Sequence, residues 1–147
     1  MNRLWTLPAT AGVILLAVAC AREKDRLDAE VRRLCARDGG VKVYEKVILS
    51  ADEFNRFGVP SIPSKEKMRP EDNYYYERHV EYLQGGNPEL LRSQHLLKRR
   101  KDGKVLGESV RYTRRGGDLP GPWHESSFSC PNIGAQPPLE KLVFQKE

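Results

Sequence analysis

The sequence lacks most of the patterns by which enzymes and metalloproteins are recognised. It has only three cysteines and three histidines in 147 residues. No two cysteines have C-x-x-C spacing, and His79, His95 and His124 are not spaced as metal ligands. It also has no G-x-S-x-G nucleophile turn, no H-E-x-x-H pair and no glycine-rich phosphate loop. We therefore expect neither a metal nor a cofactor.

Long hydrophobic runs are also scarce, and the chain has one uncharged apolar run, at residues 9–19 (ATAGVILLAVA). This run is shorter than the roughly 20 residues that a transmembrane helix needs. Arg3 precedes it, and it ends in Ala17-Val18-Ala19, an A-x-A cleavage pattern. The pattern predicts a signal peptide over residues 1–19 and export from a bacterial cytoplasm.

Cys20 comes directly after this run and is followed by a polar, charged stretch. The segment Leu16-Ala17-Val18-Ala19-Cys20 resembles the lipobox of bacterial lipoproteins, in which the cysteine is acylated, with palmitate among the chains, and becomes the mature first residue. Ala21 stands where an inner-membrane retention signal usually has Asp, so the resemblance implies an outer-membrane anchor, with the domain facing the periplasm. The alternatives are an ordinary secreted protein cut after Ala19, or an uncleaved anchor.

The overall charge is mildly basic, with a formal value of +5 at pH 7. This is below the charge density of a dedicated nucleic-acid binder, and export also argues against nucleic acid as a partner. Anionic components of the envelope remain as candidates, namely lipopolysaccharide phosphates, acidic phospholipid and peptidoglycan. A protein partner is equally open.

Two further cysteines, Cys35 and Cys130, remain in the mature chain. Because an exported protein meets an oxidising compartment, we expect them to form one disulfide that ties the helix near Cys35 to the carboxy-terminal segment. The alternative is two free thiols.

A helix is predicted at residues 23–37, after a short tether at 20–24. Leu27, Val31, Leu34 and Cys35 fall at i, i+4, i+7 and i+8 and form one apolar stripe. Gly39-Gly40 then provides the helix stop.

Strands are predicted at residues 41–49, 74–84, 126–130 and 141–145, with a helical turn at 51–57 and an irregular loop at 58–73. The clearest element is a hairpin of residues 91–100 and 104–114 around Asp102-Gly103. A two-residue turn there makes His95 face Val110, Leu97 face Glu108 and Ser93 face Tyr112. We therefore predict a single α+β domain over residues 20–147, with one N-terminal helix packed on an antiparallel sheet of about four to six strands.

Basic residues crowd this hairpin and are the main candidate for binding an anionic partner. They lie at the hairpin tip and along its second strand, beside the aromatic residues Tyr112 and Trp123. The alternative is a solubilising strand whose charges prevent pairing between sheets. The set consists of Lys98, Arg99, Arg100, Lys101, Lys104, Arg111, Arg114 and Arg115.

The most enzyme-like string is residues 123–127 (WHESS). A hydrolase would use His124 as base, Ser126 or Ser127 as nucleophile and Asp118 as the orienting acid. Alternatively, His124 would act with a nearby carboxylate, Asp118 or a glutamate, within hydrogen-bonding reach. His95 is expected on the packed face of its strand as a hydrogen-bonded structural residue. His79 is expected to be exposed and charge-paired.

The sequence favours a non-catalytic binding or accessory module of the cell envelope. Residues 35–44 and 103–130 resemble small lipoproteins of proteobacteria, a resemblance that implies no activity. The alternatives are the small periplasmic hydrolase and a secreted inhibitor or immunity-type protein.

Overall fold

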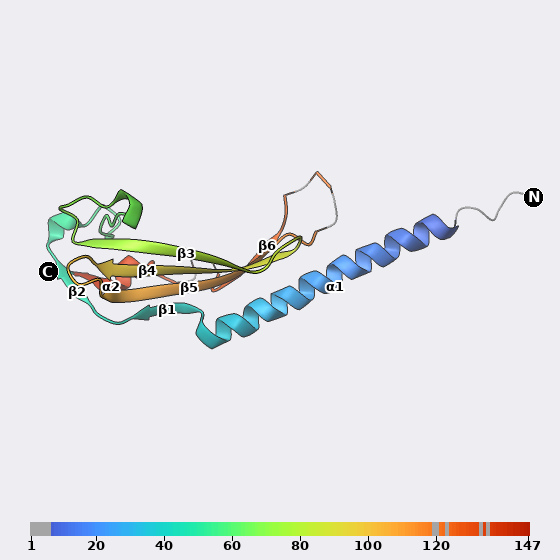
Figure 1. Ribbon diagram of the computed structural model, residues 1–147, viewed down its shortest axis with the longest axis horizontal. Coiled ribbons are helices and arrows are strands. Elements are labelled where there is room, and N and C mark those ends of the chain that lie inside the picture. The colour runs from blue at the N-terminus through green and yellow to red at the C-terminus, as the bar shows by residue number, and fades with distance from the viewer. Residues whose placement is uncertain (1–6, 119–120, 123, 133, 135) are drawn as a thin grey trace, which may run out of the picture.

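The protein is an α+β domain in which a long helix packs on a mostly antiparallel sheet, as predicted (Figure 1). The computed structural model describes residues 7–118, 121–122, 124–132, 134 and 136–147, with helical side chains described from residue 22. Helix α1 spans Leu7–Asp38. Within the described part of the chain, no helix is long and apolar enough to cross a membrane.

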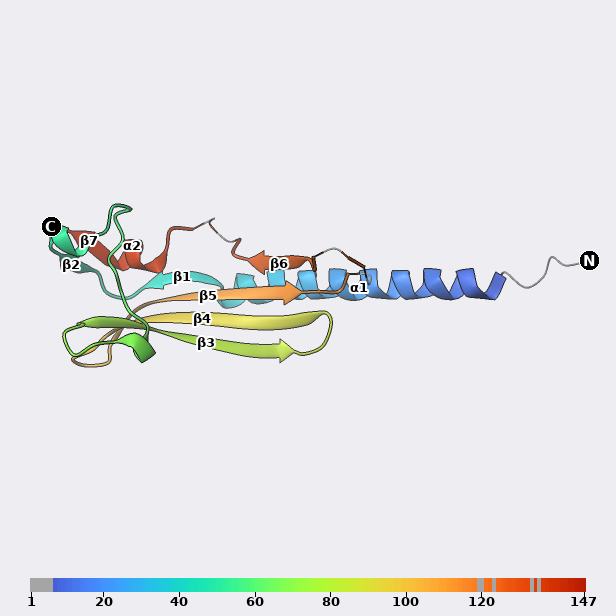
Figure 2. The same cartoon turned by 90° about the horizontal axis from the view of Figure 1, so that it is seen from above.

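The main sheet has five strands. Their bounds are β1 Gly40–Val43, β3 Tyr74–Gln84, β4 Glu89–Arg99, β5 Val105–Arg115 and β6 Ser127–Cys130. The order is β1-β5-β4-β3, and β6 pairs with the same edge of β5 as β1, further along the strand. Figure 2 shows β3, β4 and β5 side by side, so β3 forms one edge of the sheet.

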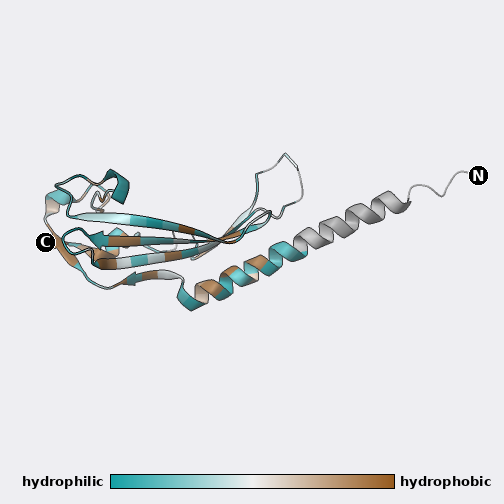
Figure 3. Ribbon diagram, in the orientation of Figure 1, coloured by the Kyte–Doolittle hydropathy of each residue, from teal (hydrophilic) through white to brown (hydrophobic). Residues whose placement is uncertain are grey.

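Helix α1 covers one face of this sheet, here called the helix face. The predicted stripe is buried there: Leu27, Val31 and Leu34 pack against Leu90, Val110 and Tyr112. Figure 3 shows the matching alternation of apolar and hydrophilic residues along the described half of α1. The predicted disulfide is present, since Cys35 and Cys130 are bonded at an S–S distance of 2.07 Å beside this core.

A second core lies on the opposite face, at the end of the sheet nearest the hairpin tip. It is built by α2 (Leu139–Val143) and by a parallel pair of short strands, β2 (Val47–Leu49) and β7 (Phe144–Lys146). These elements bury Leu97 and Leu106. Two short 3-10 turns, at Ala51–Glu53 and Lys65–Lys67, lie in the long connection before β3.

The predicted hairpin is confirmed, but its predicted register is wrong by one residue. His95 pairs with Ser109, Leu97 with Gly107 and Ser93 with Arg111. The register shifts between Leu97 and Lys98, which pairs with Val105, so Leu106 is an extra residue on β5. A bulge of this kind directs the extra side chain to the face of its partner, which explains why Leu106 joins the core of Leu97.

Two other strand predictions are also corrected. Residues 41–49 form two strands in different sheets, because the N–H groups of Tyr44 and Glu45 both donate to the Leu106 carbonyl at the bulge and the chain leaves the sheet there. Residues 141–145 begin as helix α2. Leu139 and Val143 are four apart and both buried, a helical spacing that overrides the strand pattern.

Residues 20–24, predicted as a tether, continue α1. The side chain of Lys24 reaches Asp118 at 2.6 Å, and the Gln84 amide donates to Glu23 at 3.4 Å. Glu23 and Lys24 therefore both contact the rest of the domain.

Candidate functional site

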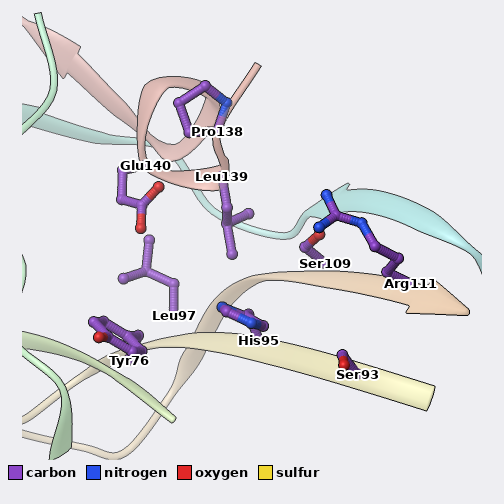
Figure 4. Close-up of a pocket in the computed structure, with 9 residues that line it drawn as sticks. All are labelled: Tyr76, Ser93, His95, Leu97, Ser109, Arg111, Pro138, Leu139 and Glu140. Carbon is purple, nitrogen blue, oxygen red and sulfur yellow. The ribbon is translucent and has the colours of Figure 1, made fainter. Parts of the chain in front are cut away.

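The face of the sheet opposite α1 carries a groove, here called the groove face. Elements α2 and β7 cover one end of this face, and hollows lie beside them and along the strands beyond. A hollow of about 190 Å³ lies under α2, and a wider one of about 450 Å³ continues along β4, β5 and β6. Figure 4 shows the smaller hollow, with Pro138, Leu139 and Glu140 on one side and Tyr76 and His95 on the other.

Arg111 is the residue on which the hollows converge. It lines both of them, and it lines a third, of about 80 Å³, beside Val41 and Gln136. Its Nε is buried and has no hydrogen-bond partner among the described residues. An unsatisfied buried donor on a cation costs free energy. The Arg111 side chain as a whole is only partly buried, so the rest of its guanidinium lies along the hollows.

Hydroxyl groups surround Arg111 on neighbouring strands. Because side chains alternate between the faces of a sheet, each strand contributes every second residue to the groove. The hydroxyl-bearing residues that line the hollows are Ser93 on β4, Ser109 and Thr113 on β5, Ser127 and Ser129 on β6, and Ser126 just before β6.

Other ionisable groups line the groove as well. Arg78 and Arg115 line the wider hollow, and Arg115 pairs with Glu89 at 3.2 Å. One carboxylate is found in each hollow, Glu140 in the smaller and Glu125 in the wider. The cationic groups of the lining therefore outnumber the acidic ones, with Arg111 common to both hollows.

His95 lies on this groove face, so its predicted place on the packed face is wrong. Its ring is exposed to the groove and stacks on Tyr76, with ring centroids 6.3 Å apart. Partial burial lowers the pKa of His95, and the positive charge of Arg78 lowers it further.

The predicted hairpin cations are largely neutralised by carboxylates. Lys98 pairs with Glu77 at 2.7 Å, while Arg99 and Lys104 both pair with Glu45. Arg99 also pairs with Asp102 at 2.9 Å. Of the tip cations, Lys101 is exposed and makes no ion pair within the described part of the chain.

Arg100 and Arg114 have structural contacts instead. The Arg100 guanidinium donates to the backbone carbonyls of Arg69 and Pro70 and holds the long connection against the hairpin tip. Arg114 is only 2% exposed and pairs with Asp28 of α1 at 2.8 Å. Tyr112 is fully buried under α1. The prediction that it lies beside an exposed basic surface is therefore wrong.

Glu77 and Asp118 are the two carboxylates whose pKa values are most strongly altered. Hydrogen bonds from Lys65 and Lys98 lower the pKa of Glu77 to about 2. Those from Lys24 and from Ser126 lower the pKa of Asp118 to about 2. Both carboxylates are held in ion pairs within the fold, away from Arg111.

The residues proposed for a hydrolase are only partly brought together. The Ser126 hydroxyl donates to Asp118 at 2.9 Å, but Asp118 is also bound by Lys24 and thus links α1 to the turn before β6. His124 is exposed and forms no hydrogen bond among the described residues. Trp123 and the side chain of Cys20 lie outside the described residues.

Sequence reasoning missed the groove itself. The available signal was the alternation Ser93-x-His95 on one strand and Ser109-x-Arg111-x-Thr113 on the next. Only the correct register shows that these residues share a face. No family model, curated protein or solved structure matches this chain.

Proposed function

We propose that this protein is an outer-membrane lipoprotein, anchored through Cys20 after removal of residues 1–19, whose domain faces the periplasm as a non-catalytic binding module. The apolar run, the A-x-A pattern and the placement of Cys20 support the anchor. The disulfide between Cys35 and Cys130 is consistent with an oxidising compartment.

The ligand that we propose is an anionic glycan, a sugar that carries a phosphate or a carboxylate. The observation that carries this proposal is the buried, unpartnered Nε of Arg111 at the meeting point of three hollows. A guanidinium recognises phosphate and carboxylate through paired N–H donors. An anion seated in the hollow shared with Ser93 and His95 pairs with the partly buried guanidinium of Arg111.

The remaining lining suits the sugar that carries the anion. The serine and threonine hydroxyls both donate and accept hydrogen bonds, as sugar hydroxyls do. Tyr76 supplies an aromatic surface at one end of the groove. A hydrolase is less favoured, because His124 does not contact the pair formed by Asp118 and Ser126.

Binding is tested with glucose 1-phosphate and glucuronate as probes, and with glucose as the neutral control, by NMR titration of the full-length chain. We expect Arg111→Gln to weaken binding of the anionic probes by about 10- to 100-fold, since a hydrogen bond to a charged group contributes roughly 1.5–3 kcal/mol. Lys101→Gln removes the same charge from the exposed tip and leaves affinity within about twofold. The stronger of the two anionic probes identifies the anionic group preferred.

Equal binding of glucose, or equal losses in the two variants, would contradict the anionic-glycan site. Binding of phosphatidylglycerol vesicles without either sugar probe would contradict it too and assign the cation-rich surface to lipid.

The anchor is tested separately by intact-mass spectrometry of protein purified from membranes, beside a Cys20→Ala variant. We expect a mature chain that begins at Cys20 and carries acyl mass, and loss of that mass in the variant. A non-acylated chain would contradict the anchor and leave the groove proposal standing, since the two rest on different residues.

A further inference from the structure

Among the described residues, the outer edge of β3 is the longest unpaired edge of the main sheet. Near its start, the Tyr76 N–H donates outward to the Pro63 carbonyl, and Ser64 forms an isolated bridge with Tyr76. From Arg78 to Gln84 this edge pairs with no other described residue. Val80, Tyr82 and Leu83 on this stretch are 44%, 60% and 41% exposed. A long exposed edge of this kind is a template for pairing with another strand.

The direction of the free backbone groups follows from Tyr76. In an antiparallel pair, alternate residues direct both the N–H and the C=O toward the same neighbour. Since the Tyr76 N–H points away from β4, the backbone groups of Arg78, Val80 and Tyr82 also point outward. Those of His79 and Glu81 point inward, to β4.

We propose that two copies of this chain pair through their β3 edges, antiparallel, with Val80 opposite Val80 on the two-fold axis. Hydrogen bonds between the two strands form only where a residue with outward backbone groups lies opposite another such residue. The registers that meet this condition near the centre of the free edge have their two-fold axis at His79, Val80 or Glu81. An axis at Glu81 places two glutamates directly opposite each other. An axis at His79 places Glu77 opposite Glu81. Like charges directly opposite are destabilising.

The register centred on Val80 replaces these repulsions with complementary pairs. His79 then faces Glu81 of the second copy, and Arg78 faces Tyr82, a cation–π pairing. Within one chain, His79 already lies 3.6 Å from Glu77, so the imidazole of His79 has carboxylate neighbours on both sides along the helix-face side of this edge once it also faces Glu81 of the second copy. The chain is therefore complementary to itself in this register: two imidazole–carboxylate pairs and two Arg78–Tyr82 pairs form, and no two glutamates lie opposite each other. This self-complementarity selects a second copy as the occupant of the edge.

The pairing also has a consequence for the groove. A two-fold axis perpendicular to the sheet keeps both α1 helices on one side and both groove faces on the other. Arg78, which lines the wider hollow, then gains Tyr82 of the second copy as a neighbour. The dimer presents two grooves on one continuous surface, and its formation does not require the ligand.

Cysteine cross-linking of the full-length chain tests both the pairing and its register. Cα atoms of a hydrogen-bonded antiparallel pair are about 5.5 Å apart, within the range that a disulfide spans. We expect Val80→Cys to give a covalent dimer on mild oxidation. Leu83 is about as exposed as Val80, but the two copies of residue 83 lie about 20 Å apart in this register. We therefore expect Leu83→Cys to give no covalent dimer. The parent chain, without an added cysteine, is oxidised in parallel and measures any cross-linking through the native Cys20.

Sedimentation of charge variants provides the second test. His79→Glu places like charges across the axis, and we expect it to shift the protein to monomer. The double variant His79→Glu with Glu81→His restores the imidazole–carboxylate pair across the axis, and with it the dimer. Monomeric protein up to millimolar concentration, cross-linking through Glu81→Cys but not Val80→Cys, or no effect of the charge exchange would each overturn the proposal.

Discussion

Arg111 and Arg114 lie three residues apart on β5 and have opposite surroundings. Arg114 faces α1, where Asp28, the Gly116 carbonyl and Ser126 all accept its hydrogen bonds. Arg111 faces the groove, and its buried Nε has no acceptor among the described residues. An odd separation on a strand places two side chains on opposite faces. Arg114 on the helix face thus has acceptors within the fold, whereas Arg111 on the groove face has a buried donor without one among the described residues.

The largest expected effect is on the helix face, at the disulfide. Replacement of Cys35 and Cys130 by alanine is expected to lower the free energy of unfolding by about 3–5 kcal/mol, because the bond closes a long loop in the unfolded chain. Chemical denaturation measures the loss. A change below about 1 kcal/mol would mean that the α1 core alone fixes the helix to the sheet.

Arg114→Gln is expected to cost about 2–4 kcal/mol, because it leaves Asp28 partly buried and unpaired. The matched control is Arg115→Gln, which removes a half-exposed ion pair with Glu89 and costs less than about 1 kcal/mol. Adding Asp28→Asn to Arg114→Gln is expected to recover part of the loss in a double-mutant cycle. Equal losses of unfolding free energy for Arg114→Gln and Arg115→Gln would contradict the claim that the buried ion pair matters more than the exposed one.

Glu77 provides a smaller, pH-dependent effect on the helix face. Its pKa falls from an ordinary 4.5 to about 2 in the folded protein, so its contribution is present above pH 4.5 and is lost as the pH falls toward 2. After allowance for the exposure of Lys65, we expect Glu77→Gln to cost about 1–2 kcal/mol at pH 7. Below pH 2 the variant and the parent are expected to converge. A difference that persists there would assign the loss to packing.

Arg111→Met is expected to have the smallest effect on stability, within about 0.5 kcal/mol of the parent or slightly stabilising. The substitution removes an unsatisfied donor and retains an apolar stem of similar length. Thermal denaturation without ligand measures it. A loss comparable to that of Arg114→Gln would show that Arg111 is a structural residue.

Hydrophobic periodicity predicted the helix and the strands whose formation depends on residues close together in the sequence. The stripe of Leu27, Val31 and Leu34 predicted the helix, and alternation predicted β3 over residues 74–84 with the bounds observed. The hairpin register was not predictable, because nothing local to Leu106 marks the bulge. That single residue determines which side chains share the groove face.

The candidate site was likewise only partly predictable from residues close together in the sequence. A run of basic residues stood out at positions 98–104, but their carboxylate partners at Glu45 and Glu77 are distant in sequence. Of the eight basic residues predicted to bind an anionic partner, Arg111 and Arg115 line the groove, and both lie outside this run. The density of basic residues along the chain therefore pointed to the hairpin. Which of its cations are neutralised depends on carboxylates that only the tertiary structure brings near.

The most direct test follows the Nε–H signals of Arg111 and Arg114 by ¹H–¹⁵N NMR during titration with inorganic phosphate, with the Arg111→Lys spectrum to assign the first signal. The account predicts a saturable shift of the Arg111 signal, while the Arg114 signal stays in place because its acceptors are already within the fold. An Arg111 signal that does not respond at millimolar phosphate, or two signals that move together, would contradict an anion site on the groove face.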